Sequence, residues 1–166
     1  MDGEHEIQKA YESILGHDFQ KAIEWFEKAI AVEPDNAAYH YKLSITYARS
    51  NKLHKAIDHA TKAAHLEESS QAYKYHLQIL HARALVEEAQ YHVNEKEEHP
   101  EKAIFLLKEA IALDPLAIEA YLILGEVFAK RHDYHRARQT VLEALRLEPD
   151  HELAKQQLDL YERQMK

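Results

Sequence analysis

The chain has 166 residues and a formal net charge of −8, which is enough length for one domain with a sizeable core and the wrong sign of charge for a typical nucleic-acid-binding surface. It contains no cysteine, three glycines and four prolines, which excludes a disulfide framework and cysteine-based metal sites and favours helix. The first ten residues, MDGEHEIQKA, are acidic rather than apolar, and no uncharged apolar stretch approaches the roughly 20 residues that a membrane-spanning helix needs. We therefore expect a soluble cytoplasmic protein with no membrane span.

A ten-residue phrase recurs four times along the chain. Its copies are EKAIAVEPDN, TKAAHLEESS, KEAIALDPLA and LEALRLEPDH, which begin at residues 27, 61, 108 and 142. Successive copies are 34, 47 and 34 residues apart, so one interval is 13 residues too long. A fixed period of this length is the signature of a repeat protein. We predict a single domain over 1–166 that comprises four repeats, at about 3–36, 37–70, 71–117 and 118–151, and a final segment, 152–166.

The second half of each repeat has the periodicity of an amphipathic helix. In the first repeat the apolar residues from Ala22 to Ile30 are spaced i, i+1, i+4, i+7 and i+8, and the third repeat has the same pattern from Ala103 to Ile111. Alanine dominates these positions, and a methyl group lets two helix axes approach closely. Three of the repeats then close with Glu-Pro or Asp-Pro, which ends a helix because proline cannot continue it.

This pattern resembles the tetratricopeptide repeat (TPR) family, whose 34-residue repeats fold as two antiparallel helices. The family positions W-x2-L-G-x2-Y are occupied by Tyr121, Leu124, Gly125 and Phe128 in the fourth repeat and by His40, Leu43, Ser44 and Tyr47 in the second. The second repeat departs from the family in having Glu68 where a closing proline is expected. The resemblance implies an all-α, right-handed solenoid of four helix-turn-helix repeats, with 152–166 as a capping helix that covers the last apolar face.

The third repeat contains the 13 extra residues. From Gln71 to His99 there is neither glycine nor proline, and Pro100 suits the first position of the next helix, so the insertion is expected to lengthen the first helix of this repeat to about 71–95. Its apolar residues keep steps of four and three, the 3.5-residue period of a coiled-coil seam: Tyr75, Ile79, Ala82, Val86, Ala89 and Val93. We expect this extension to contact a neighbouring part of the chain, a partner or a second copy.

No catalytic or metal-binding motif stands out, although the chain contains 13 histidines. His132 and His135 straddle a predicted turn, and His54 and His59 are five residues apart, which points them to different faces of a helix. There is no H-E-x-x-H motif and no glycine-rich phosphate loop. We therefore predict no enzymatic activity, no metal and no cofactor, and we keep an adaptor that responds to metal or pH through its histidines as an alternative.

In the TPR resemblance, the first helices line a concave groove that holds a peptide or a partner helix. Positions 5, 9 and 12 of each repeat form one stripe, and eleven of these twelve residues are apolar or aromatic. Position 13 adds three basic residues beside the stripe. The alternative is that the stripe only packs neighbouring helices and that the cations only complement helix dipoles. The candidate partner-binding residues are Tyr11, Tyr41, Ile45, Arg49, Tyr75, Ile79, Arg83, Val86, Leu122, Glu126 and Lys130.

The sequence therefore predicts a non-enzymatic scaffold or adaptor that binds a helical or extended segment of another protein, with apolar anchors and some acidic residues. The alternative is a structural homo-oligomer, at its simplest a homodimer, assembled through the helix 71–95. Some TPR co-chaperones hold a C-terminal carboxylate with a clamp of Lys and Asn. Those positions hold Ile7, Tyr11 and Lys42 here, so we do not expect chaperone tails to bind.

Overall fold

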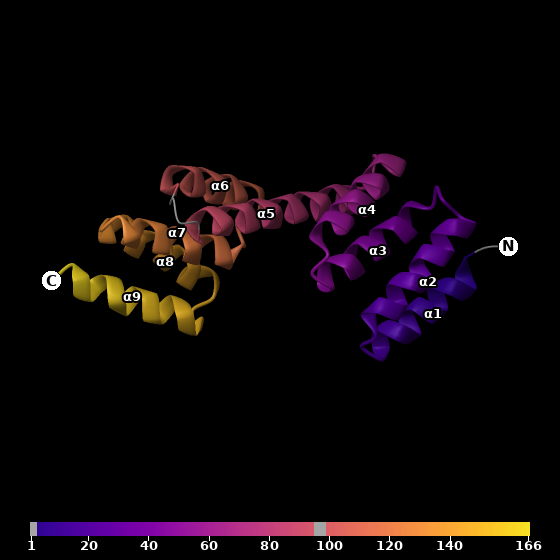
Figure 1. Cartoon of the computed structure of the whole chain (residues 1–166), viewed down its shortest axis with the longest axis horizontal. Helices are drawn as coiled ribbons and strands as arrows, with labels where there is room; N and C mark the ends of the chain where they lie inside the picture. Colours follow the sequence, from indigo (N-terminus) through magenta and orange to yellow (C-terminus); the bar gives the residue numbers. More distant parts are fainter. Residues whose placement is uncertain (1–2, 95–98) are drawn as a thin grey trace. The chain divides into compact units, whose positions relative to one another are not determined.

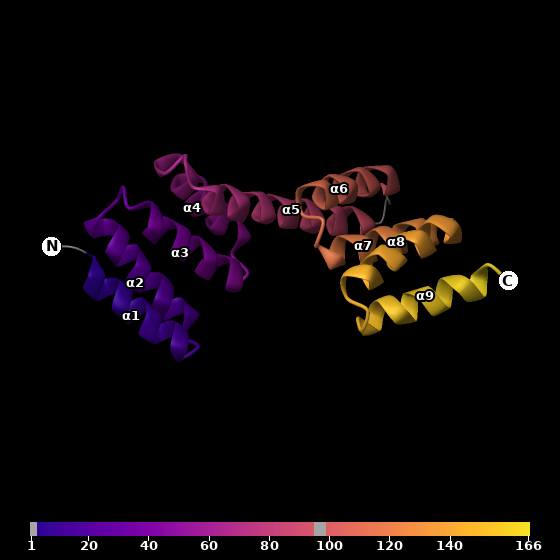
Figure 2. The same cartoon turned by 180° about the vertical axis from the view of Figure 1, so that it is seen from behind.

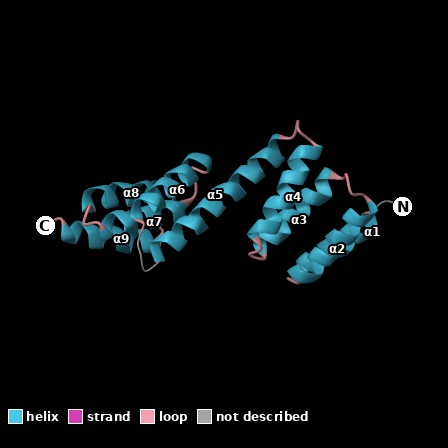
Figure 3. Cartoon of the chain, turned by 45° about the horizontal axis from the view of Figure 1, so that its top comes forward, coloured by secondary structure: helices cyan, strands magenta, loops and turns pink. Residues whose placement is uncertain are grey.

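A computed structural model describes residues 3–94 and 99–166, and over these residues the chain is helical, without any strand. The predicted all-α class is therefore confirmed (Figure 1; Figure 3). The helices are α1 (Glu4–Leu15), α2 (Phe19–Val32), α3 (Ala37–Arg49), α4 (Leu53–Leu66), α5 (Gln71–Asn94), α6 (Pro100–Leu113), α7 (Ile118–Lys130), α8 (Tyr134–Leu147) and α9 (Glu152–Gln164).

The helices fall in pairs on the four repeats, and α9 occupies the segment predicted as a cap. Helix α5 has 24 residues, whereas α1 has 12 and α2 has 14, so the insertion does lengthen the first helix of the third repeat. Residue 95, which the sequence placed in this helix, lies outside the described residues. Helix α6 begins at Pro100, where a missing backbone N–H costs nothing because the first turn has no acceptor for it.

The chain divides into two compact units, Met1–Leu80 and His81–Lys166, which we call the N-terminal and C-terminal units. The boundary falls within α5, whereas the sequence predicted one domain, and the domain count stays a prediction. In the N-terminal unit α1 packs on α2, α2 on α3 and α3 on α4. In the C-terminal unit α6 packs on α7, α7 on α8 and α8 on α9 (Figure 1; Figure 2).

The turn between the two helices of a repeat has one geometry in three repeats. The second of the three turn residues is His17, Asn51 or His132, each with a φ of 58° or 59°. In the fourth repeat the His132 N–H donates to the Ala129 carbonyl over 2.9 Å, which helps to satisfy the last carbonyls of α7. Two of the histidines therefore occupy left-handed turn positions, where glycine would be the easiest residue and histidine is one of the better-tolerated alternatives.

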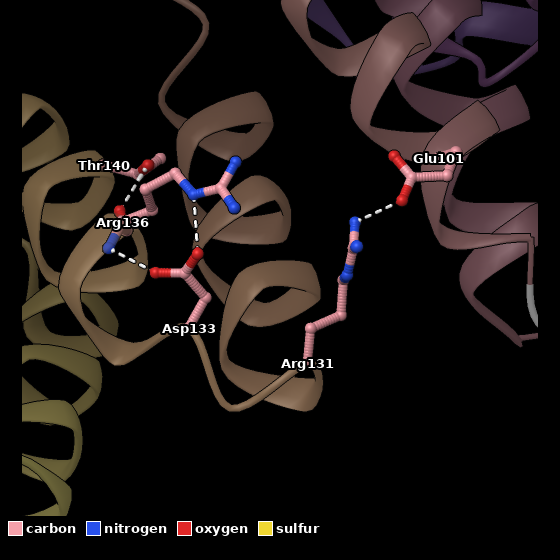
Figure 4. A network of polar contacts seen from close by, with 5 residues as sticks. All are labelled: Glu101, Arg131, Asp133, Arg136 and Thr140. Atoms are coloured by element: carbon pink, nitrogen blue, oxygen red, sulfur yellow. Dashed lines mark hydrogen bonds and ion pairs between the residues drawn. The ribbon is translucent and has the colours of Figure 1, made fainter.

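A network of polar contacts fixes this turn in the fourth repeat (Figure 4). The Asp133 carboxylate caps α8 by accepting from the backbone N–H of Arg136 over 3.0 Å and from its Nε over 2.6 Å. These two hydrogen bonds lower the pKa of Asp133 below its ordinary value. On the other side of the turn, Arg131 pairs with Glu101 of α6 at 2.6 Å, which links the turn to the preceding repeat.

In the second and fourth repeats the eighth residue is small, and the two helices of the repeat approach closely there. In the second repeat this residue is Ser44, fully buried, whose hydroxyl donates to the Ala56 carbonyl over 2.7 Å. In the fourth it is Gly125, where an added Cβ would lie 2.9 Å from Val141 Cγ2 and 3.5 Å from the Ala137 carbonyl oxygen. A larger residue at this position would force the helix pair apart.

Gly125→Leu is therefore expected to destabilise the protein by about 1–3 kcal/mol, the usual cost of overpacking a core, despite the higher helix propensity of leucine. Gly16→Leu is the matched control, because a Cβ there meets only backbone oxygens at 3.6 Å. Urea unfolding followed by far-ultraviolet circular dichroism measures both. Equal stability of the two variants would contradict close packing at Gly125.

Candidate functional site: a tyrosine-rich surface of the N-terminal unit

The candidate residues of the N-terminal unit lie on α1, α3 and the first part of α5, and they keep exposed surface. Tyr11 is 40% exposed and Tyr75 is 56% exposed. Tyr41, Ile45 and Ile79 are half-buried, and Arg49 is exposed at the last residue of α3. The stripe predicted from sequence is therefore partly packed within the chain and partly open to solvent.

Tyr11 connects α1 to α3 through Lys42. The Lys42 ammonium donates to the Tyr11 hydroxyl and lies 4.7 Å from the centroid of its ring, a cation–π geometry. The other contact of the ring is edge-to-face with the buried Phe26 at 6.0 Å. Tyr11 is thus anchored on the core, while its outer face and the charge of Lys42 remain at the surface.

Tyr41 connects α3 to α5 through two aromatic contacts. Its ring lies 4.8 Å from that of Tyr73 and 5.1 Å from that of His76, the latter edge-on at 85°. Burial is the main cause that raises the pKa of the Tyr73 hydroxyl, and Glu67 adds to it, so this hydroxyl stays neutral and available as a donor or acceptor. Sequence reasoning missed Tyr73 because it lies outside the 5/9/12 stripe.

A surface hollow of about 550 Å³ lies beside Tyr11. Its lining includes the apolar side chains of Ile7 and Leu15 and the ring of Tyr39, with Glu4, Gln8 and Glu12 at its polar part. Leu15 and Tyr39 were not predicted as site residues, since a spacing rule on first helices does not reach the end of α1 or the third residue of α3. We call Tyr11, Tyr39, Tyr41, Lys42, Tyr73 and Tyr75 together the tyrosine surface.

The candidate residues of the C-terminal unit have different environments. Val86 is 5% exposed and Leu122 is 7% exposed, and both belong to the hydrophobic core of this unit, so neither presents an open surface to a partner. Arg83 pairs with Glu87 and Lys130 pairs with Glu126, each at 3.4 Å along one helix. Two of the three cations of the predicted basic ladder are thus paired with carboxylates of their own helices.

The packing of the later part of α5 explains why Val86 is buried. Val86, Ala89 and Val93 form part of one core cluster with residues of α6 and α7. Of the six seam residues that the sequence named, Val86, Ala89 and Val93 belong to the core of the C-terminal unit, whereas Tyr75 is exposed. The insertion therefore builds core, and Val86 is excluded from the surface proposed below.

Within residues 3–94 and 99–166, no three His, Asp or Glu side chains converge in a way that could hold a metal ion. In the same residues, no helix combines the length and the apolar character that crossing a membrane requires.

Comparison with known families gives the same result as the fold. Residues 17–58 match the family model described as "TPR repeat", and residues 95–152 match the one described as "Tetratricopeptide repeat". The chain belongs to the tetratricopeptide repeat family. Proteins of this family are generally non-enzymatic scaffolds, and family and fold together support a protein–protein interaction module. No curated protein matches the sequence.

Solved structures of TPR proteins share the fold at low sequence identity. A crystal structure of MamA aligns with 98% of this chain and 82% of its own, at 22% identity and a TM-score of 0.55. A MamA fragment from Desulfovibrio magneticus RS-1 aligns with 98% and 85%, at 15% identity and a TM-score of 0.58. A TPR protein from Parabacteroides merdae ATCC 43184 aligns with 98% of this chain and 60% of its own, at 20% identity and a TM-score of 0.57. These likenesses establish the fold and leave the partner open.

Val86→Ala is expected to destabilise the C-terminal unit by about 2 kcal/mol, because it removes buried methyl groups and leaves a cavity. Glu87→Ala on the same helix is the control, since Glu87 is exposed and an exposed ion pair contributes about 0.5 kcal/mol or less. Thermal melts followed by circular dichroism compare the two. A Val86→Ala protein as stable as Glu87→Ala would mean that the seam is not part of the core.

Proposed function

We propose that the tyrosine surface of the N-terminal unit binds an extended or helical segment of another protein that carries apolar anchors and acidic side chains. The observation that carries the proposal is Tyr75, which is 56% exposed on the same helix as Tyr73, whose ring packs on that of Tyr41. Tyrosine supplies a large contact area with few rotors to freeze, and it is enriched among the residues that dominate binding energies. The proposal is confined to this unit.

The charged side chains of this surface indicate which kind of segment it would bind. Lys42 directs its ammonium at the Tyr11 ring, and Arg49 is exposed at the end of α3. In contrast, the two cations of the predicted basic ladder that lie in the C-terminal unit, Arg83 and Lys130, pair with carboxylates on their own helices. A carboxylate of the bound segment placed near Lys42 or Arg49 would therefore gain an ion pair without displacing one seen in the structure, which favours acidic side chains beside apolar anchors.

A second copy of the chain is the competing occupant of this surface. The seam from Val86 to Val93 lies in the core of the C-terminal unit, so the part of the predicted seam that remains open to a second copy is its beginning, around Tyr75 and Ile79. Light scattering over a range of protein concentrations distinguishes the two occupants. A monomer at concentrations where a peptide binds supports a foreign segment, whereas a dimer that Tyr75→Ala dissociates supports self-assembly.

Tyr75→Ala is expected to weaken binding about 30-fold, which corresponds to about 2 kcal/mol for an exposed aromatic anchor. The probe is a peptide selected on the full-length protein from a random displayed library, and its affinity is measured by fluorescence anisotropy. Tyr91→Ala is the matched control, because Tyr91 is 63% exposed on the same helix and lies outside the tyrosine surface. Equal loss in both variants, or no loss in Tyr75→Ala, would place the binding site elsewhere.

Arg49→Gln is expected to slow association of an acidic peptide several-fold at low salt and to change dissociation little, because exposed charges act mainly by steering the encounter. Lys62→Gln removes the same charge from an exposed position on α4 and serves as the control. Stopped-flow association at two salt concentrations tests the difference. If Arg49→Gln and Lys62→Gln behave alike, only the net charge of the protein matters.

A further inference from the structure

Three histidines contribute to the contacts between α3, α4 and α5: His40 and His59 form a pair between α3 and α4, and His76 contacts α3 from α5. The Nδ1 atoms of His40 and His59 lie 2.9 Å apart, and the two rings are stacked with centroids 5.1 Å apart. His76 lies 2.9 Å from the Ser44 hydroxyl through Nε2 and is edge-on to Tyr41. His40 is buried, and the other two are half-buried. Their sequence separations hid this arrangement, since the contacts run between helices.

The hydrogen bonds fix where the protons of these rings lie. The Nε2 atom of His40 is 2.9 Å from the Pro34 carbonyl oxygen, which only accepts, so this nitrogen carries a proton. A neutral His40 then has a bare Nδ1, and the proton between the two rings is donated by His59 Nδ1. The Ser44 hydroxyl gives its proton to the Ala56 carbonyl, so it accepts from His76 Nε2.

We propose that this cluster makes the packing of α3, α4 and the first part of α5 sensitive to protons, so that the N-terminal unit loosens as the pH falls from about 7.5 to about 5.5. The His40–His59 pair holds one added proton, at His59 Nε2, while keeping its hydrogen bond. A second proton would place two N–H groups against each other across 2.9 Å, and the bond would be lost. The protonation of the two rings is therefore coupled.

The surroundings of the cluster also disfavour protonation of His59 in the folded state. Burial lowers the pKa of His59, and the neighbouring charges of His40 and Lys55 lower it further, against the opposite pull of Asp58 and Glu27. Glu27 of α2 accepts a hydrogen bond from Tyr47 of α3, whose ring stacks on His59 at 5.6 Å. The ammonium of Lys55 on α4 lies over the Tyr47 ring.

On the α5 side, burial lowers the pKa of His76. A histidine whose pKa is lower in the folded state than its ordinary value of 6.5 binds fewer protons when folded. Its contribution to stability is therefore complete above pH 6.5 and is lost as the pH falls from there towards the folded-state pKa. His59 and His76 act in the same direction, so their losses coincide within this window.

In the fourth repeat, the positions of His40 and His59 are occupied by residues that do not titrate near neutral pH. Tyr121 takes the place of His40 there, and its hydroxyl donates to the Pro115 carbonyl over 3.1 Å, as His40 Nε2 donates to Pro34. Thr140 takes the place of His59. The contact between a ring and the proline carbonyl therefore occurs in both repeats, whereas the pair of histidines occurs only in the second. The chain itself therefore supplies a replacement that preserves the contact and does not titrate near neutral pH.

The test is urea unfolding of the full chain at pH 7.5 and 5.5, followed by the fluorescence of Trp25, the single tryptophan, which lies on α2 of the N-terminal unit. The wild-type midpoint is expected to be lower at pH 5.5 by about 0.5 M. Trp25 also contacts His5, so the midpoint is used rather than the intensity. The triple variant His40→Tyr/His59→Thr/His76→Gln should lose most of this shift. Tyrosine and threonine are the residues that the fourth repeat has at the first two positions, and glutamine can donate to Ser44 without titrating.

The control is His54→Gln/His65→Gln, which removes two exposed histidines of α4 and should retain the wild-type shift. A wild-type midpoint that does not move, or a shift of equal size in the triple variant, overturns the proposal. Nitrogen-15 spectra of the wild-type histidines decide the matter even if the triple variant fails to fold. They are expected to show the proton on Nε2 of His40 and on Nδ1 of His59 at pH 7.5, and the opposite assignment overturns the proposal.

A final arm asks whether the cluster regulates binding, and this arm alone rests on the proposed function. The affinity of the selected peptide should fall at least about threefold between pH 7.5 and 5.5 in the wild type and much less in the triple variant. The unfolding arm needs no peptide, so a protein that shows the stability shift but binds no peptide at the tyrosine surface refutes the proposed function and leaves the proton-sensitive packing established. A protein that binds equally at both pH values refutes the regulation.

Discussion

The close approach of the two helices within a repeat is the constraint on which the rest of the structure depends. At Ser44 and Gly125 the first helix lies so near the second that only a hydroxymethyl group or a hydrogen atom fits. Fully buried alanines line the facing helices, among them Ala56 and Ala137. Within each unit, successive repeats also pack on one another, α2 on α3 and α6 on α7.

The 13 extra residues show how a repeat protein uses a longer helix. An amphipathic helix with a 3.5-residue seam must cover that seam, because exposed apolar rows cost free energy in water. In the C-terminal unit the row from Val86 to Val93 packs into the core with α6 and α7. Of the two exposed tyrosines of the same helix, Tyr75 precedes this row and Tyr91 lies within its span. The insertion thus enlarges the core of the C-terminal unit.

The sequence predicted the helices well because its signals are local. Proline stops, alanine spacing and the 34-residue period depend on neighbours within a repeat, and even the second repeat, with Glu68 in place of proline, ends its helix at Leu66 as the period requires. The site was harder to predict because periodicity identifies a face of a helix and not what covers that face. Val86 and Tyr75 lie on one predicted stripe, yet one is core and the other is open. The histidines were judged along single helices, while His40 and His59 meet across two.

The fourth and second repeats show how a shared contact acquires a different property. Both use a ring at position 4 to donate to the carbonyl of the proline that closes the preceding repeat. A phenol ring has a single polar atom, so Tyr121 donates to that carbonyl and has no second polar atom that needs a partner. An imidazole has two nitrogens, and once Nε2 of His40 is committed to Pro34, its Nδ1 needs a donor within the protein. His59 supplies this donor. As a consequence, the hydrogen bond between the two rings depends on their protonation at a pH near neutrality. A substitution that is nearly neutral for packing therefore changes how one repeat responds to its surroundings. The affected repeat carries Tyr41 and Lys42, so a change in its packing would reach the surface proposed to bind a partner.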